Sequence, residues 1–337
     1  MNYKMVLFTM GRVVLLEAAL LVLPMAVSLL YGEKCALSFA LTILVALAVG
    51  FLLTKLCRGE HGSSSIKDGF MIVALTWIML SAIGALPFVF SREIPLYVDA
   101  FFETVSGFTT TGATILPDVE ALSRGMLFWR SFTHWIGGMG ILVFVVMLLK
   151  TPDRSINILK AEMPGPTVDK LAPKSKDTAR ILYLLYMALT VLEIVFLLLG
   201  GMSLFDSVVH ALSTAGTGGF GAYNASAANF SPYIQWVLTA FMFLFGVNFN
   251  LYYLLLLKRG TELLRNTELK VYVGIVLVSV AAITIDILPL YQSFSVSLRQ
   301  AAFQVTSIMS TTGFITADFT VWSPLSKMVL LMLMFVG

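Results

Sequence analysis

Three short stretches of this chain share one spacing: a Ser, a Thr four residues later, and a Gly two residues after that. Each stretch lies between two long apolar runs. A backbone rich in Thr and Gly is tolerated at membrane depth only where protein or a water-filled path satisfies its carbonyl groups. We therefore interpret the pattern as a repeated re-entrant loop, whose carbonyl oxygens would replace the water around a monovalent cation. The three sets are Ser106, Thr110 and Gly112; Ser213, Thr217 and Gly219; and Ser307, Thr311 and Gly313.

The composition is that of a membrane protein. Of 337 residues, 58% are hydrophobic and 12% charged, and the mean hydropathy is +0.90. Such a chain is too apolar for an ordinary soluble domain, so we expect an all-α protein embedded in a lipid bilayer. The first run, with Lys4 and Arg12, could instead be a signal peptide, but a second span follows at once. Runs long enough to cross lie near 5–30, 36–56, 68–90, 126–149, 180–200, 233–257 and 270–291, and an eighth begins near 323.

Most positive charges lie in every second connection between these runs, that is, on one side of the membrane. Sixteen of the 22 Lys and Arg residues precede or begin the first run or lie within 55–67, 150–180 and 258–270. By the positive-inside rule this side is cytoplasmic, which predicts a multi-pass protein with a cytoplasmic N-terminus. Each repeat then has the same sense: a span going out, a short helix and loop dipping back in, and a span returning.

The chain divides into four segments on this basis. We predict an N-terminal transmembrane hairpin at 1–57, a first pore repeat at 58–150, and a cytoplasmic linker with a second pore repeat at 151–260. A third pore repeat occupies 261–337, with its second helix cut short. Parallel repeats around an axis along the membrane normal are one way to build a transport path. The charged linker at 151–179 is either a docking surface or a solvated connection.

A short helix is expected before each loop, at Tyr97–Phe108, Phe205–Ala215 and Leu298–Met309. Glycine in the loops can adopt positive φ and let successive carbonyl groups face one axis. The loops carry no carboxylate, so they offer dipoles without net charge, which favours a weakly hydrated monovalent ion over Mg²⁺ or Ca²⁺. The predicted ion-binding residues are Thr110, Thr111, Gly112, Thr217, Gly218, Gly219, Thr311, Thr312 and Gly313.

Ionisable residues also occur inside the apolar runs. Glu17, Glu193 and Asp286 have no counterparts in the other repeats, so a role in helix contacts is favoured over one in transport. Arg130 and His134 lie one turn apart on a returning span. They either brace the first loop through Glu103 or extend to the membrane interface.

No pattern predicts an enzyme. The three histidines, His61, His134 and His210, are scattered, and no nucleotide-binding or phosphate-binding motif is present. We expect no catalytic residue, no bound cofactor and no nucleic-acid partner. Cys35 and Cys57 flank the second run, about 33 Å apart along a helix, too far for a disulfide.

Several stretches resemble one known family. They are FFETVSGFTTTGA at 101–113, WIGGMG at 135–140, AEMPGP at 161–166 and FQVTSIMSTTGF at 303–314. They look like the Trk/Ktr/HKT superfamily of potassium transporters, and most like the bacterial Trk-type pore subunit. The resemblance covers nearly the whole chain. It implies four membrane–pore–membrane units around a K⁺ pathway, a homodimer in the cell inner membrane, and a cytoplasmic nucleotide-binding regulatory subunit. Relatives with Ser at the first filter glycine resemble Na⁺ carriers, so Gly112 favours K⁺.

The resemblance also implies a fourth repeat, which this chain lacks. Ser323 to Gly337 spans about 22 Å as a helix, too short to cross a bilayer. We therefore expect a truncated chain with three of four pore loops. K⁺-selective uptake is the leading hypothesis. An ion-coupled solute symporter and a non-conducting fragment remain alternatives.

Overall fold

The computed structural model describes residues 3–57, 66–140, 175–256 and 265–337. Within these ranges every regular element is helical, as the sequence predicts. The chain forms two compact units, Met1–Tyr183 and Leu184–Gly337, and the boundary falls inside helix α10 (Ser175–Leu199). The predicted linker at 151–179 lies mostly outside the described residues, and the division into pore repeats stays a prediction.

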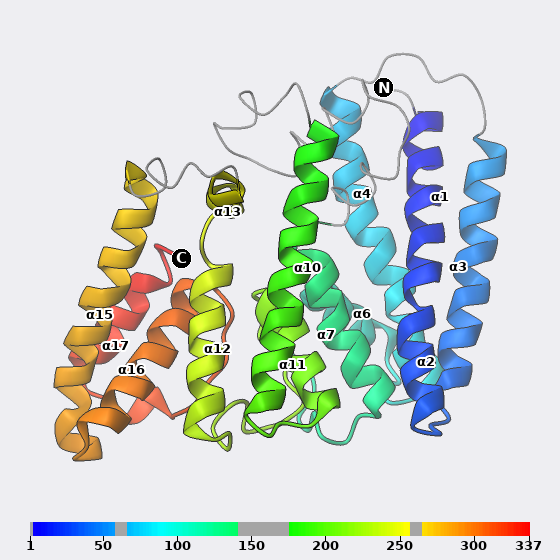
Figure 1. The fold of residues 1–337 in the computed structure, drawn as a ribbon. Coiled ribbons are helices and arrows are strands. Elements are labelled where there is room, and N and C mark those ends of the chain that lie inside the picture. Colours follow the sequence, from blue (N-terminus) through cyan, green and yellow to red (C-terminus); the bar gives the residue numbers. More distant parts are fainter. Residues whose placement is uncertain (1–2, 58–65, 141–174, 257–264) are drawn as a thin grey trace. The chain divides into compact units, whose positions relative to one another are not determined.

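The first unit begins with a helical hairpin (Figure 1), made of α1 (Tyr3–Leu20), α2 (Val22–Leu30) and α3 (Ala36–Leu56). The helices α1 and α3 pack closely because glycines face each other at their crossing. A Cβ on Gly11 would lie 3.0 Å from the Gly50 carbonyl oxygen, and a Cβ on Gly50 would lie 3.0 Å from that of Gly11. Small residues allow such close backbone approach between membrane helices.

The hairpin packs against three helices around the first loop: α4 (Ile66–Gly84), α5 (Leu86–Ser91) and the returning helix α7 (Arg124–Gly138). The pore helix α6 (Tyr97–Phe108) packs in turn against these three helices. The chain bends between α4 and α5, just before Pro87. The Trp129 indole donates to the Gly84 carbonyl oxygen at 2.9 Å, so this carbonyl at the bend is satisfied by a side chain.

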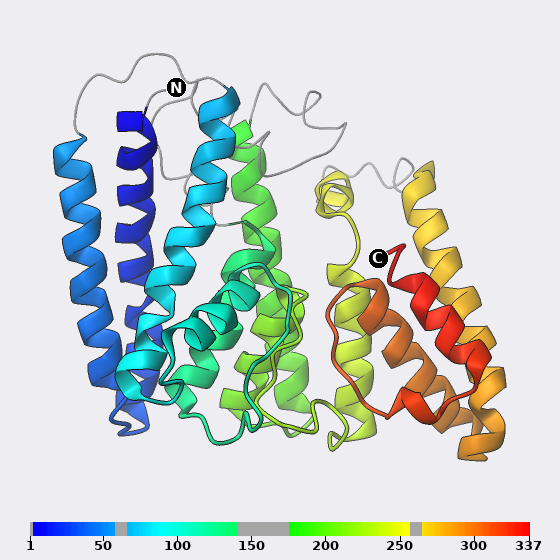
Figure 2. The ribbon, with the colours of Figure 1, turned by 180° about the vertical axis from the view of Figure 1, so that it is seen from behind.

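The second unit continues from α10 with the pore helix α11 (Leu204–Ala215), then α12 (Pro232–Phe245) and α13 (Phe249–Leu256). It ends with α15 (Thr267–Tyr291), the pore helix α16 (Phe294–Met309), a short 3₁₀ turn η3 (Phe319–Val321) and α17 (Pro324–Leu333). Figure 2 shows α16 between α12 and α15, with α17 beside α15 and α16. The buried side chains of Ile283, Val305, Trp322 and Leu330 form the core of this bundle.

Among the residues that the structure describes, five helical spans are long and apolar enough to cross a membrane, two of them made of successive helices: Tyr3–Leu30, Ala36–Leu56, Lys67–Ser91, Arg180–Leu199 and Thr267–Tyr291. The chain is therefore a multi-pass membrane protein. The pore helix α6 has the predicted bounds and α11 starts one residue early. The third pore helix starts at Phe294, four residues before the predicted Leu298. The reason is that Gln292, at φ 51°, ends α15 directly before the new helix.

Two predicted spans are not continuous helices, which corrects the sequence prediction. The run at 233–257 breaks at Gly246, between α12 and α13. Hydroxyl groups of Tyr252 and Tyr272 donate to the carbonyl oxygens of Leu244 and Phe243 at 2.7 and 3.1 Å, so side chains satisfy the carbonyls at the break. In the run at 126–149, α7 ends at Gly138, and residues from 141 on lie outside the described ranges.

Candidate functional site

All three pore helices end in similar backbone turns. In the first, the amide of Thr110 donates to the Gly107 carbonyl oxygen at 3.1 Å and that of Thr111 to Ser106 at 2.9 Å. The second repeats both bonds, from Thr217 to Thr214 and from Gly218 to Ser213. The third has Thr311 to Ile308, but Gly313 takes the place of Thr312 in the bond to Ser307. The first two are Schellman turns, which cap the last carbonyl groups of a helix, and the third differs from them in this one bond.

The left-handed residue of each turn is a threonine. Its φ is 54° at Thr110, 52° at Thr217 and 60° at Thr311. That conformation is normally reserved for glycine, and a β-branched residue there is strained. Sequence reasoning did not predict these angles, because threonine disfavours them. The recurrence of one costly conformation in three loops is typical of a functional site, where the surrounding structure imposes it.

Each threonine is followed two residues later by a glycine with positive φ, as predicted. The angles are 75° at Gly112, 78° at Gly219 and 85° at Gly313. The sequence signal for these loops, a Ser, Thr and Gly at fixed spacing, therefore marks one backbone path that recurs three times.

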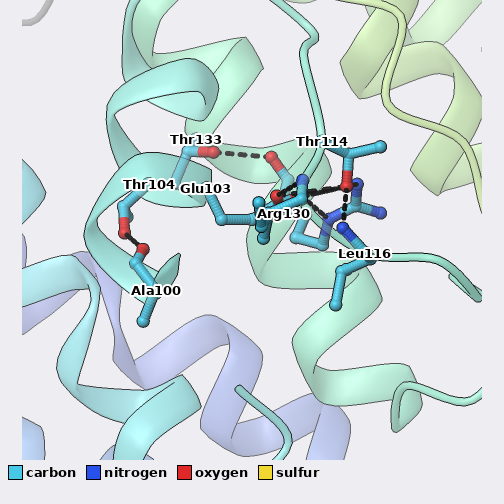
Figure 3. Close-up of polar contacts among 8 residues, drawn as sticks. Ala100, Glu103, Thr104, Thr114, Leu116, Arg130 and Thr133 are labelled. Atoms are coloured by element: carbon cyan, nitrogen blue, oxygen red, sulfur yellow. Dashed lines mark hydrogen bonds and ion pairs between the residues drawn. The ribbon is translucent and has the colours of Figure 1, made fainter. Parts of the chain in front are cut away.

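The first loop is braced from behind by a buried ion pair (Figure 3). Arg130 of α7 contacts Oε1 of Glu103 on α6, with Nη2 at 2.7 Å and Nε at 2.8 Å. The carboxylate also accepts from the Thr114 hydroxyl at 3.0 Å and from the Ile115 amide at 3.0 Å. Glu103 and Arg130 are 1% and 3% exposed. Of the two hypotheses for Arg130, bracing through Glu103 is therefore correct, and extension to the interface is wrong.

The second loop is braced by aromatic packing around His210, which occupies the position of Glu103 in α11. The centroid of the His210 ring lies 5.0 Å from the ring centroid of Phe230, 5.8 Å from that of Phe314 and 6.1 Å from that of Tyr223. Its Nδ1 lies 2.8 Å from the Asp206 carbonyl oxygen, which can only accept, so Nδ1 carries the proton. The histidine therefore braces the loop without an ion pair.

The third loop is held by neutral hydrogen bonds. The Ser307 hydroxyl donates to the Phe314 carbonyl oxygen at 2.7 Å, and the Thr316 hydroxyl donates to Gln300 of α16. Beyond the loop, the hydroxyl and the amide of Thr320 donate to Asp318 and hold the pKa of that carboxyl group below its usual value. Each of the three loops thus reaches the same backbone path with different supporting side chains.

The second and third loops meet inside the second unit. A Cβ on Gly219 would lie 2.1 Å from the carbonyl oxygen of Thr312, so only glycine fits there. No such contact restricts Gly313, where a Cβ would meet nothing within 4 Å. The backbones of two predicted ion-binding segments therefore lie against each other.

A comparison with known protein families decides what this scaffold is. The model of the family TrkH, described as a cation transport protein, matches residues 36–337. This chain belongs to the TrkH family.

Its relatives and structural neighbours agree with that assignment. The Trk system potassium uptake protein TrkH of Salmonella typhimurium is 37% identical over 344 residues, which cover 100% of this chain and 71% of that protein. The Trk system potassium uptake protein TrkG of Escherichia coli is 33% identical, over 100% of this chain and 70% of the relative. The crystal structure of the potassium transporter TrkH from Vibrio parahaemolyticus superposes with a TM-score of 0.85 at 30% identity, covering 99% of this chain and 70% of that one.

The predicted Trk-type resemblance and the all-helical membrane fold are therefore confirmed for this TrkH-family chain. The family is one of transporters, in line with the expected absence of enzyme chemistry. Among the described residues no cluster of His, Cys, Asp and Glu could hold a metal ion, and both Cys35 and Cys57 are free.

The intramembrane acids take separate places. Asp286 of α15 accepts hydrogen bonds from Ser323 and Ser326 at the start of α17, the helix-contact role that was predicted. Glu17 is 1% exposed and lies beside Gly84, close to α6, whereas Glu193 is fully buried in α10. Neither acid lies in a Thr/Gly loop. After the break at Gly246, Asn248 donates to Glu268 at 3.2 Å. Of the three histidines, His61 lies outside the described residues.

Proposed function

We propose that this protein transports K⁺ selectively, through a filter of backbone carbonyl groups on its Thr/Gly loops. The observation that carries the proposal is the recurrence of a left-handed Thr and a left-handed Gly at the end of three pore helices. The relatives are potassium uptake proteins, which supports the choice of ion. The proposed filter residues are Thr110, Thr111, Gly112, Thr217, Gly218, Gly219, Thr311, Thr312 and Gly313.

The chemistry of such a filter is solvent replacement. A K⁺ ion loses its water on entry, and carbonyl dipoles take its place, while the absence of a fixed charge lets the ion leave again. The buried braces behind the loops, Glu103 with Arg130 and the aromatic residues around His210, keep the carbonyl groups from collapsing onto a smaller ion. The helix C-termini carry partial negative charge and would add to the attraction.

The assembly is part of the same proposal. The pore repeats at 58–150, 151–260 and 261–337 would each contribute one Thr/Gly loop to the filter, with the glycines Gly112, Gly219 and Gly313. We further propose a homodimer in the cell inner membrane, with a cytoplasmic N-terminus and a cytoplasmic nucleotide-binding regulatory partner. The positive-inside pattern supports the orientation. Cysteines introduced at Lys270 and Asn224 test it, because only position 224 should react with an impermeant reagent from outside.

The decisive experiment on the filter is Gly112→Ser. A serine at φ 75° is strained, so K⁺ over Na⁺ selectivity should fall by about 5- to 30-fold, the equivalent of roughly 1–2 kcal/mol. Ion uptake into bacteria that lack their own K⁺ transporters measures it. Gly274→Ser is the matched control, since a Cβ there meets nothing within 4 Å and the residue has no positive φ. Unchanged selectivity in a Gly112→Ser protein at normal membrane levels would remove Gly112 from the filter. Uptake that requires a co-substrate would instead favour a symporter.

A further inference from the structure

The non-helical segment at 312–316, which we call the third filter strand although it belongs to no sheet, is held by the second repeat. The amide of Ile315 donates to the Ser226 hydroxyl oxygen at 3.1 Å, and the amide of Ala227 donates to the Ile315 carbonyl oxygen at 2.9 Å. Both backbone groups of Ile315 are thus bound by two adjacent residues of another loop. Ile315 lies two residues after Gly313, so a shift of this strand would move the filter backbone with it.

The first loop provides the contrast. There the corresponding strand is held within its own repeat, because Glu103 accepts from Thr114 and from the Ile115 amide. In the third repeat the aligned residue is Gln304, whose Nε2 is buried without a hydrogen-bond partner among the described residues. The third repeat therefore holds Phe314 and Thr316 by its own side chains, but Ile315 takes its support from the neighbouring repeat.

The supporting segment is itself fixed in place. Ser226 has a φ of 51°, another left-handed non-glycine residue, and its amide donates to the Tyr223 carbonyl oxygen at 3.0 Å. From α12, the side chain of Gln235 donates to the carbonyl oxygens of Ala227 and Ala228 at 3.1 and 3.3 Å. Carbonyl oxygens only accept, so the amide group of Gln235 must face them with its NH₂. Gln235 is 3% exposed, and its hydrogen bonds are therefore shielded from water.

The two loops also meet at the filter itself. The contact between Gly219 and the Thr312 carbonyl oxygen leaves no room for even a methyl group. Phe314, between Gly313 and Ile315, packs on the His210 ring. The third filter strand is thus bound to the second repeat on both sides of Gly313, at Thr312 and at Ile315.

We propose that the segment Tyr223–Phe230 sets the position of the third filter strand, with Ser226 and Gln235 as positioning residues for ion selectivity. This inference rests on the proposed function, because it assigns a role to residues outside the filter in the selectivity of that filter. Neither side chain belongs to a Thr/Gly loop, and the sequence pattern does not single out either one.

Two substitutions remove the support at different points. Ser226→Gly is compatible with the left-handed backbone and deletes the CH₂OH side chain, and with it the hydroxyl oxygen that binds Ile315. Gln235→Met replaces the amide by an apolar side chain of similar length. Thr239→Val is the control, since Thr239 is a buried neighbour one turn along α12 whose hydroxyl bonds only to the Gln235 carbonyl oxygen of its own helix.

The first measurement is hydrogen exchange in the purified protein. The backbone amides of 313–316 should exchange faster in Ser226→Gly and Gln235→Met, by about fivefold, the scale of one net hydrogen bond. The second is the ratio of K⁺ to Na⁺ uptake, which should fall by a similar factor while the maximal rate per membrane-inserted protein stays within about twofold. Because both side chains act on one segment, the double variant should be no worse than the stronger single one.

Some outcomes would overturn the inference. One is an unchanged hydrogen-exchange rate of the amides of 313–316. Another is an unchanged ratio of K⁺ to Na⁺ uptake in both variants, and a third is an equal loss of selectivity in Thr239→Val. A fall in the uptake rate that follows the amount of protein, with selectivity intact, would likewise show a purely structural role. Gly313→Ser separates the two proposals. If Gly313→Ser changes selectivity and the loop variants do not, only the positioning role fails, whereas if none of them changes it, the filter itself is wrongly placed.

Discussion

Arg130 and the first loop bind the same carboxylate, that of Glu103. Oε1 receives Nε and Nη2 of the arginine at 2.8 and 2.7 Å and the Thr114 hydroxyl at 3.0 Å, whereas Oε2 accepts from the Ile115 amide at 3.0 Å. A single buried carboxylate thus connects the returning helix α7 to the loop segment that follows Gly112.

We predict that Arg130→Met destabilises the protein by about 3–5 kcal/mol, because it leaves the Glu103 carboxylate buried without its cation. Thermal unfolding in detergent and the amount of protein in the membrane measure the loss. The double variant with Glu103→Gln removes the unpaired charge and should recover part of the stability, so the two changes should not be additive. Additive losses would show that the pair does not act as a unit.

The second prediction compares Gly219→Ala with Gly313→Ala. Both glycines have positive φ, at 78° and 85°, so alanine brings similar strain to each, about 1–2 kcal/mol. Only at Gly219 does the new Cβ meet a backbone atom, the Thr312 carbonyl oxygen at 2.1 Å. We expect Gly219→Ala to reduce membrane levels and K⁺ selectivity more than Gly313→Ala does. Equal effects would mean that strain alone decides, and that the two loops can separate.

The third prediction concerns the left-handed threonines. Thr110→Gly removes the left-handed strain at φ 54° and should raise the melting temperature, by the equivalent of about 1 kcal/mol or less once the flexibility of glycine is included. Thr111→Gly is the control, because the neighbouring threonine has no positive φ and gains no such relief. Thr111→Gly should therefore lower the melting temperature. The same sign of change at both positions would argue against stored strain at Thr110.

The fourth prediction concerns Nε2 of His210, the ring nitrogen that does not face Asp206. Its Nε2 has no hydrogen-bond partner among the described residues, and a Cβ on Gly221 would lie 3.5 Å from it, an ordinary contact. Gly221→Ser places a hydroxyl group there, as Thr114 does beside Glu103 in the first repeat. We expect it to be more stable than Gly221→Ala by about 1 kcal/mol, the value of one hydrogen bond. Both variants share the loss of glycine flexibility, so the difference in their melting temperatures isolates the hydroxyl group. Equal melting temperatures would show that His210 accepts no bond from that side.

The sequence predicted the elements of the fold well, because apolar runs of membrane length and repeated spacings are local signals. The bounds of α6 and the positive φ of Gly112, Gly219 and Gly313 follow from such signals. The break at Gly246 was missed, since an apolar run looks the same whether it continues as one helix or divides. The hydroxyl groups of Tyr252 on α13 and Tyr272 on α15 satisfy carbonyl groups of α12 at the break, and only the tertiary structure brings Tyr272 there.

By itself, the sequence determined that this chain crosses a membrane several times, that its loops repeat a Ser, Thr and Gly spacing, and that it belongs among Trk-type transporters. Tertiary structure alone decided how each loop is supported: by an ion pair at Glu103, by aromatic rings at His210, and by another repeat at Ile315. It also decided that threonine takes a left-handed conformation against its own preference. The physical reason is that supporting contacts join residues far apart in the chain. Their energy exceeds the local preference of any single residue, and no spacing in the sequence records which partners meet.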